Sequence, residues 1–430
     1  MTGALPLNIA ASPTPQSARF AVAGVFLING IAGANWFVRI PAIQDTLELT
    51  TASLGVLLLG MPVGAVLAMP LAGGLVAHIG SRSVNWFSTI AVCLSVALLG
   101  LAPNAWLLFG ALVLFGAANG AMDVSMNAQG VAVERHYGRS IMSSFHGMFS
   151  IGSMFGAATG GLIASLGVGA PAHLVGVSVV LIVAALIVPR WMLPASEDAH
   201  GALESDAPPR LLTRIPRPVL VLGIVGFCGL LAEGAMADWS AVFLRDVLET
   251  TPGMAAVGYT VFSFAMATGR FSGDRLADRF GSVAIVRYGS LVSAVGLLIV
   301  ALTTWAPAAL LGFALVGAGL SIIVPIIFST AGRTPGIAPG QAIAAVTTLS
   351  YVGFLAGPPS IGIIASVVTL RGGFLFIVGL MLAMTALAGT VRGAGSLHTS
   401  SSAGSVPPRP DSDYATLRGR AIVDDTGKSL

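Results

Sequence analysis

The chain has 430 residues, of which 55% are hydrophobic and only 9% are charged. Soluble globular domains carry about 25% charged residues, so this composition excludes an ordinary soluble domain and indicates a membrane protein. The formal net charge is +3, but the basic residues are scattered along the chain, so no nucleic-acid partner is expected.

Residues 1–17 form a segment without a charged start and a short apolar core, so we expect no cleavable signal peptide. Twelve apolar stretches of about 20 residues follow, each long enough to cross ~30 Å of hydrocarbon. They cover 18–40, 53–77, 84–102, 105–132, 141–166, 173–193, 217–245, 254–277, 284–303, 307–330, 341–367 and 373–391. No run alternates apolar and polar residues, so the sequence predicts an all-α membrane protein.

The last six stretches repeat features of the first six. Residues 156–165 read GAATGGLIAS, and about two hundred residues later 357–366 read GPPSIGIIAS. Similarly, residues 34–36 read ANW, and 237–239 read ADW. A duplicated six-helix unit indicates a transporter built from two pseudo-symmetric bundles related by an axis along the membrane normal.

Polar segments set the predicted domain boundaries. We expect a cytoplasmic N-terminal segment at 1–17, an N-terminal six-helix bundle at 18–193 and a cytoplasmic linker at 194–216. A C-terminal six-helix bundle at 217–391 follows. Residues 392–430 are rich in Ser, Gly and Pro, so they are expected to form a disordered cytoplasmic tail.

The distribution of Lys and Arg predicts the orientation. If both termini are inside, only Arg39, Arg245 and Arg371 of the 21 Lys and Arg residues fall outside. Cytoplasmic loops carry such an excess of basic residues, so both termini are predicted to be cytoplasmic.

A cysteine placed at Ser205, in the linker, is therefore expected to resist a membrane-impermeant maleimide added to intact cells. Ready labelling from outside would reverse the predicted topology.

Asp123 is the first ionisable group expected within the membrane. It lies in the fourth stretch with Asn119 and Asn127 one turn away on the same helix face, and Gln129 follows. Charged groups inside a bilayer are expensive and usually functional, so Asp123 is a candidate proton carrier facing a central cavity. The alternative is an interhelical hydrogen bond that only locks packing.

Two other acids lie in the seventh stretch. Glu233 is near its middle, and Asp238 lies about 7.5 Å nearer the outer end at 1.5 Å per residue. Both are candidates for proton coupling. The alternative for Asp238 is a pairing with Arg245 or Arg39.

His146, in the fifth stretch, is a further candidate. Its functional interpretation is a proton relay with Asp123, and the alternative is a hydrogen-bonded packing residue.

Trp36 and Arg39 end the first stretch, where Pro41 is expected to break the helix. Trp36 is interpreted as an interfacial anchor, and Arg39 as a residue that either snorkels to the interface or pairs with Asp45 or Glu48.

In the alternative interpretation, Trp36 and Arg39 form an outer gate or contact the substrate, and Asn35 faces the cavity. The residues considered for substrate binding are Asn35, Trp36, Arg39, Asn119, Asn127 and Trp239.

Alternating charges follow the eighth stretch and indicate a gate at the cytoplasmic end. They are Arg270, Asp274, Arg275, Asp278 and Arg279, with Arg82 after the second stretch. Such a cluster can clamp helix ends through ion pairs, and the alternative is positive-inside anchoring alone.

Cys93 and Cys228 each lie inside an apolar stretch without a partner spacing, so neither a disulfide nor a metal site is expected. No phosphate-binding loop of the Walker type is present, so ATP is not expected as the fuel. No nucleophile or metal cluster indicates an enzyme, and no cofactor is expected.

These features together resemble the major facilitator superfamily over residues 18–391. The loop signature of that family is Gly-x-x-x-Asp-Arg-x-Gly after helices 2 and 8; the second copy here keeps Asp278, Arg279 and Gly281. The first copy has Ala77 and His78 in the Asp and Arg positions, which weakens the first-half clamp. The segments GANWFVRIP, MDVSMNAQGVAVE, SSFHGMFSIG, AEGAMADW and GRFSGDRLADRFG resemble a bacterial branch related to fucose permease.

The resemblance implies the major facilitator fold and alternating access, with a proton driving a small polar, possibly sugar-like, solute across a bacterial inner membrane. The expected partners are that small-molecule substrate, the proton and the bilayer, and a monomer is expected. Proton-driven efflux of drugs or metabolites remains an alternative, although Gly116 and Ala157 replace the Arg and Pro typical of exporters. A non-transporting membrane sensor is the alternative of another class.

Overall fold

A computed structural model describes residues 14–138, 141–195, 215–335, 337 and 339–394. Several predictions lie outside the described residues. They concern residues 1–13, most of the linker, the label at Ser205 and the tail from 395 onward.

The described residues are helical almost throughout. The helices are α1 (Pro15–Phe37), α2 (Ile40–Thr46), α3 (Thr51–Leu58), α4 (Gly60–Ile79), α5 (Ser81–Leu101), α6 (Ala105–Tyr137), α7 (Met142–Ser165), α8 (Ala170–Ile187), η1 (Val188–Trp191), α10 (Arg217–Val242), η2 (Phe243–Val247), α11 (Pro252–Phe280), α12 (Ser282–Leu302), α13 (Ala306–Leu320), α14 (Ile323–Gly332), α15 (Pro339–Val367), α16 (Leu370–Leu387) and η3 (Ala388–Ala394).

Each of the twelve predicted stretches overlaps one of these helical segments, so the all-α prediction is confirmed. Eleven segments of the described chain are long and apolar enough to cross a membrane. The twelfth is α11, which carries its charges toward its C-terminal end.

Three segments are interrupted where the sequence predicted one continuous span. The first helix stops at Phe37 and resumes at Ile40, which places Pro41 in the first turn of α2 rather than at the break. Proline is tolerated there because the first helical N–H groups have no intrahelical partner. Short breaks also separate α3 from α4 at Leu59 and α13 from α14 at 321–322.

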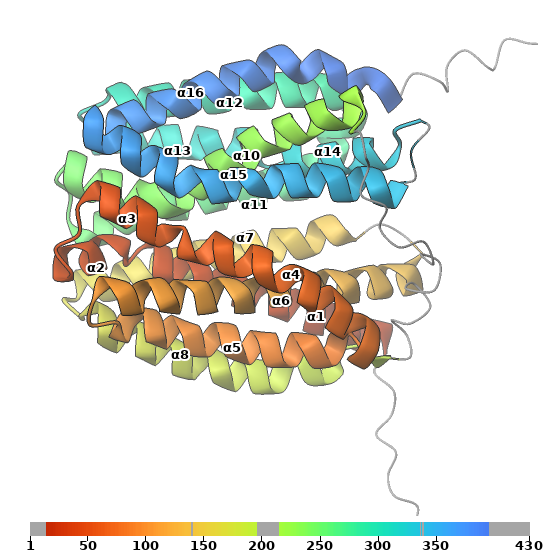
Figure 1. The fold of residues 1–430 in the computed structure, drawn as a ribbon, viewed down its shortest axis with the longest axis horizontal. Helices are drawn as coiled ribbons and strands as arrows, with labels where there is room; N and C mark the ends of the chain where they lie inside the picture. Colours follow the sequence, from red (N-terminus) through yellow and green to blue (C-terminus); the bar gives the residue numbers. More distant parts are fainter. Residues whose placement is uncertain (1–13, 139–140, 196–214, 336, 338, 395–430) are drawn as a thin grey trace, which may run out of the picture. The chain divides into compact units, whose positions relative to one another are not determined.

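The two halves have the same internal packing. Within α1–α8, α1 packs on α7, α4 on α6 and α5 on α8; within α10–α16, α10 packs on α15, α11 on α13 and α12 on α16. These are the same pairs of spans in each half, so the structure has twelve transmembrane helices in two pseudo-symmetric six-helix bundles (Figure 1). The helix ends near residues 47–50 and 368–369 lie on the left of Figure 1, at the predicted outer end.

Glycine allows the helices of each bundle to approach closely. A Cβ on Gly116 of α6 would collide with the backbone of Met61 on α4, whereas a Cβ on Gly110 of the same helix would meet open space. Interfaces of small residues hold membrane helices together through close backbone contact.

Gly116→Ala is therefore expected to lower the melting temperature of the purified protein, because overpacking costs about 1–3 kcal/mol. Gly110→Ala is the matched control and should be neutral or slightly stabilising, because Ala favours a helix over Gly by up to about 1 kcal/mol. Equal melting temperatures for both variants would show that the α4–α6 contact is not tightly packed.

The halves contact each other near the predicted outer end. A Cβ on Gly55 of α3 would lie 2.8 Å from the carbonyl oxygen of Pro358 on α15, and 2.9 Å from Cα of Gly362. On the other side, a Cβ on Gly161 of α7 would lie 2.6 Å from Cβ of Ala256 on α11. Toward the opposite end, α4 exposes Leu71 and Leu75, so this half of the helix has no tight partner.

Candidate functional site

Asp123 on α6 joins the two halves through hydrogen bonds. Its Oδ2 accepts a hydrogen bond from the Tyr351 hydroxyl of α15 at 3.1 Å, and its Oδ1 accepts one from Asn127 Nδ2 at 3.0 Å. Asn127 is one turn away on the same helix, as the sequence predicted. The carboxylate of Asp123 is thus held by one group of its own bundle and one group of the opposite bundle.

Arg270 on α11 makes the second polar contact between the halves. Its Nη2 lies 3.1 Å from Glu233 Oε1 on α10, and its Nη1 donates to Ser150 Oγ on α7 at 2.7 Å. The two side chains of the ion pair are only 11% and 20% exposed. A charge pair this far from water must be well compensated, and Ser150 supplies an additional partner from the first half.

We define the central polar cluster by its residues: Asp123, Asn127, Ser150, Glu233, Arg270 and Tyr351. Tyr351 of α15 takes part through its hydrogen bond to Asp123. Five helices, from both halves, supply its charged and hydroxyl groups: α6, α7, α10, α11 and α15.

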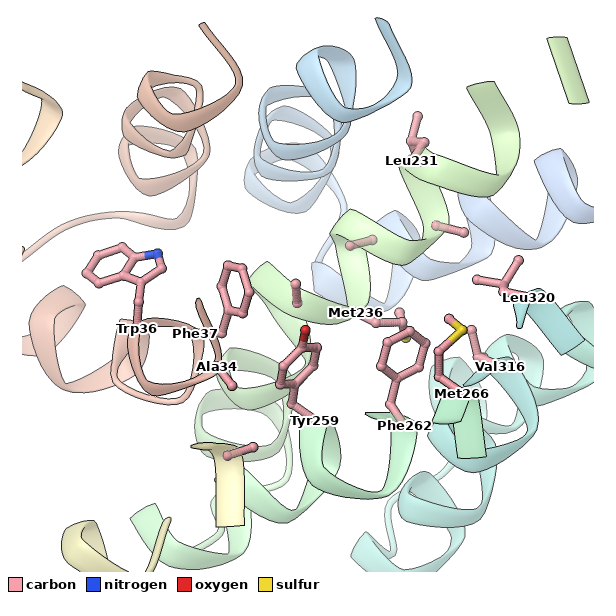
Figure 2. Close-up of a cluster of buried hydrophobic side chains, with 14 of the residues drawn as sticks. Ala34, Trp36, Phe37, Leu231, Met236, Tyr259, Phe262, Met266, Val316 and Leu320 are labelled. Atoms are coloured by element: carbon pink, nitrogen blue, oxygen red, sulfur yellow. The ribbon is translucent and has the colours of Figure 1, made fainter. Parts of the chain in front are cut away.

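An aromatic layer lies nearer the predicted outer end than this cluster. The ring of Phe37 on α1 meets that of Tyr259 on α11 edge to face at 5.4 Å, and Tyr259 stacks on Phe262 at 5.7 Å. Figure 2 shows these rings in a row that runs from Phe37 of the first half to Tyr259 and Phe262 of the second half. Arg270 lies eleven residues beyond Tyr259 on α11, about 16 Å along the helix axis.

The structure corrects the placement of Arg270. The sequence placed this residue with the charges at the cytoplasmic end, but α11 continues to Phe280, so Arg270 lies inside the bundle. The ion pair with Glu233 is what allows an arginine there.

His146 and Asp238 do not contact the carboxylate of Asp123 through any hydrogen bond of the described residues. The His146 ring packs edge to face on Phe26 at 5.2 Å, and the relay with Asp123 stays a prediction. Asp238 is buried at 8% exposure. Its predicted partners are engaged elsewhere, since Arg245 pairs with Asp45 at 3.7 Å.

Arg39 joins α1 to α8 inside the first bundle. Its Nε donates to Nδ1 of His173 at 2.8 Å, and its Nη2 donates to the Val168 carbonyl oxygen at 2.9 Å. The predicted pairing with Asp45 or Glu48 is therefore wrong. His173 lies 134 residues away in the chain, which sequence spacing could not reveal.

Trp36 and Trp239 are buried at 1% and 0% exposure, so the interpretation of Trp36 as an interfacial anchor is wrong. Asn35 is also buried, and its Nδ2 donates to the Ile31 carbonyl oxygen at 2.8 Å within its own helix. Asn119 is half-buried one turn from Asp123. Of the residues considered for substrate binding, Asn127 belongs to the central polar cluster and Asn119 lies one turn from Asp123 on α6.

Apart from Arg270, the predicted gate residues whose side chains the structure describes form no hydrogen bond or ion pair between the halves in this conformation. Arg275, Asp278 and Arg279 are exposed, and the Arg279 guanidinium lies over the Phe280 ring at 5.4 Å. Arg82 donates to the Arg190 carbonyl oxygen at 2.7 Å, within the first bundle. Asp274 lies on α11, and its side chain is outside the described set.

Asp278→Asn tests whether this cluster closes the cytoplasmic end in the opposite conformation. We expect slower net transport and a shift toward the open cytoplasmic end, because a lost ion pair of about 1 kcal/mol changes a two-state ratio several-fold. Spin-label distances across that end measure the shift. Normal transport with unchanged distances would leave the charges as a topology signal only.

Two cluster residues, Tyr351 and Ser150, were not predicted from the sequence. Each lies in an apolar stretch as an uncharged polar residue, which is common in membrane helices and carries little signal. Their partners are 228 and 120 residues away in the chain.

No group of three or more His, Cys, Asp or Glu in the described parts of the chain is arranged to hold a metal ion. Cys93 and Cys228 are buried free thiols.

Residues 22–339 match the Major Facilitator Superfamily, and the chain belongs to this family. It is 39% identical over 367 residues to an uncharacterized MFS-type transporter of Yersinia pestis, covering 85% of this chain and 94% of that protein. It is 37% identical to an uncharacterized transporter of Sinorhizobium fredii, covering 85% and 96%, and 37% identical to the membrane protein MosC of Rhizobium meliloti, covering 83% and 86%.

Solved structures show the same fold. The nucleoside transporter NupG superposes with a TM-score of 0.68 at 12% identity, covering 87% of this chain and 99% of that one. A bacterial homologue of the human lysosomal transporter Spinster, in an inward-facing and occupied conformation, gives a TM-score of 0.68 at 15% identity, covering 86% and 95%. The chain is therefore a membrane transporter of the MFS type.

Proposed function

We propose that this transporter moves a small polar solute by alternating access and that a proton bound at Asp123 drives the movement. The observation that carries the proposal is the pair of hydrogen bonds that hold the Asp123 carboxylate between Asn127 of one half and Tyr351 of the other. A hydrogen bond to an ionised carboxylate is stronger than one to a neutral group. Proton binding at Asp123 therefore changes the attraction between the halves.

The contacts between the halves support the alternating-access part of the proposal. At the predicted outer end, Gly55 meets Gly362 and the aromatic rings of Phe37 and Tyr259 touch. At the opposite end, the charged residues Asp278 and Arg279 remain exposed. We interpret this conformation as closed at the outer end, and the opposite closure would complete the cycle.

The chemistry of the central polar cluster favours a neutral solute. Its one cation, Arg270, is already paired with Glu233, so no uncompensated positive charge is offered to a phosphate or a dicarboxylate. Amide and hydroxyl groups of Asn119, Asn127 and Tyr351 suit a hydroxyl-rich molecule. The resemblance of several segments to a branch related to fucose permease supports a sugar-like solute.

The proposed setting is a bacterial inner membrane, with both termini cytoplasmic and the chain acting as a monomer. The experiment that tests the function begins with a thermal-shift screen of monosaccharides and polyols on the purified protein, since a true ligand stabilises by mass action. Solutes that raise the melting temperature are then assayed in proteoliposomes with and without an imposed pH gradient.

Accumulation of a hit against its gradient, only when a pH gradient is present, supports the proposal. Movement in the opposite direction under the same gradient would instead make the protein an exporter. Binding of hits without any transport would favour a membrane sensor.

A further inference from the structure

A surface groove on the second half is separate from the central polar cluster. It lies between α11, α12 and the α13–α14 break and has a volume of about 470 Å³. Six of the residues that line it are Leu276, Phe280, Tyr288, Val292, Ala318 and Ile322. Phe280 and Tyr288 are 56% and 63% exposed, so the groove opens on the outside of the bundle.

Glycine creates the hollow. Gly289 of α12 and Gly319 of α13 face each other in the groove, and a Cβ on Gly289 would lie 2.5 Å from the Gly319 carbonyl oxygen. The two helices therefore touch backbone to backbone, and no side chain fills the floor. Ala284 and Ala318 keep the flanks low as well. The result is an apolar groove that follows α12 from Ala284 to Val292, about 12 Å along the helix axis.

A positive stripe borders the groove at the end of α11. The Arg279 guanidinium lies over the ring of Phe280, which lines the groove, at 5.4 Å. Arg275 lies one turn before Arg279, on the same face of α11 as Arg279. This face adjoins the one that carries Leu276 and Phe280. Asp278 lies on the opposite side of the helix from Leu276 and Phe280 at 3.6 residues per turn, so the acid does not stand between the arginines and the groove.

We propose that this groove binds one anionic phospholipid of the surrounding membrane. An acyl chain lies over the Gly289–Gly319 floor, and the phosphate lies at Arg279 with Arg275 behind it. Tyr288 lines the groove midway along α12, where its ring lies beside the acyl chain. The occupant is argued from charge: Arg residues near a membrane surface attract anionic lipid, while the floor accepts only hydrocarbon.

Native mass spectrometry of the purified full-length protein in detergent tests the site. Phosphatidylglycerol and phosphatidylcholine with identical acyl chains are titrated separately, and the bound fraction is measured for each. The wild type is expected to bind phosphatidylglycerol more tightly. Arg279→Gln should weaken phosphatidylglycerol binding about fivefold, the factor for about 1 kcal/mol per arginine near a membrane surface, and weaken phosphatidylcholine binding less, because choline offsets the charge of its phosphate.

Ala318→Leu, which fills the groove, should weaken the binding of both lipids. The matched control is Arg287→Gln, which removes the same charge from an exposed residue of α12. The Arg287 guanidinium lies 3.8 Å from where a Cβ of Gly389 would stand, outside the groove lining.

Equal affinity for the two lipids in the wild type would overturn the proposal. So would an equal loss on Arg279→Gln and Arg287→Gln, because that result indicates diffuse attraction to the charged end rather than a site. If Ala318→Leu does not fold, the two arginine variants decide the question on their own.

Discussion

Replacing Asp123 with Asn is expected to abolish solute accumulation driven by a pH gradient in proteoliposomes while leaving the fold intact. The amide has the shape of the carboxylate and still accepts the hydrogen bond of Tyr351, but it cannot carry a proton. Without a group that changes charge, the attraction between α6 and α15 no longer depends on proton binding. Exchange of labelled solute down its own gradient should persist, because it does not require the proton.

Tyr351→Phe is the matched control for this prediction. It removes the cross-bundle donor but leaves the Asp123 carboxylate with Asn127 as its partner. Accumulation should fall about tenfold or more, since a hydrogen bond to a charged group contributes about 1.5–3 kcal/mol, and what remains should still require the pH gradient. Unchanged accumulation in Asp123→Asn would place the proton elsewhere, with Glu233 as the next candidate.

Replacing Glu233 with Gln is expected to produce the largest loss of stability of the substitutions considered. It leaves the Arg270 charge buried at 11% exposure with only the Ser150 hydroxyl as a partner. Removing one member of a buried ion pair costs about 3–5 kcal/mol, because the other charge remains uncompensated. The melting temperature of the purified protein should fall sharply, and transport should be lost.

Two variants distinguish the ion pair from a general effect of substitution. The double variant Glu233→Gln with Arg270→Gln removes both charges and should recover much of the stability, though not transport. Asp45→Asn breaks the exposed pair with Arg245, whose side chains are 59% and 39% exposed, and should change the melting temperature little. If Glu233→Gln were as mild as Asp45→Asn, the ion pair between α10 and α11 would not contribute to the stability of the protein.

The sequence predicted the membrane spans well because each is a long apolar run, and this property is local. The same reasoning identified Asp123 and Glu233, since an acid inside such a run stands out. Pro41 pointed to a break at the end of the first stretch, although the break lies just before it at 38–39, whereas the break at Leu59 carries no comparable local signal and was not predicted.

The partners at the candidate site could not be predicted, since each contact joins residues far apart in the chain. Nothing in the sequence marks Tyr351 or Ser150 as a functional candidate. Their role becomes visible only when the structure shows that they contact Asp123 and Arg270. Arg270 was assigned to the cytoplasmic end because arginine usually marks a loop, and only its pairing with Glu233 explains its position inside the bundle.

Spin-label distances measured at both ends as a function of pH test the central claim most directly, without knowledge of the solute. One label pair is placed at Ala77 and Ile343 for the predicted cytoplasmic ends of α4 and α15. The second pair, at Thr46 and Ser366, reports on the predicted outer end. All four positions are exposed, whereas Cys93 and Cys228 are buried and should not compete for the label.

The ionised Asp123 carboxylate accepts the Tyr351 hydrogen bond in the conformation that is closed at the outer end, so alkaline pH should favour that conformation. Acidic pH should shorten the cytoplasmic distances and lengthen the outer distances together, and Asp123→Asn should remove this dependence. Distances that do not change with pH in the wild type, or that change equally in Asp123→Asn, would contradict proton coupling through Asp123.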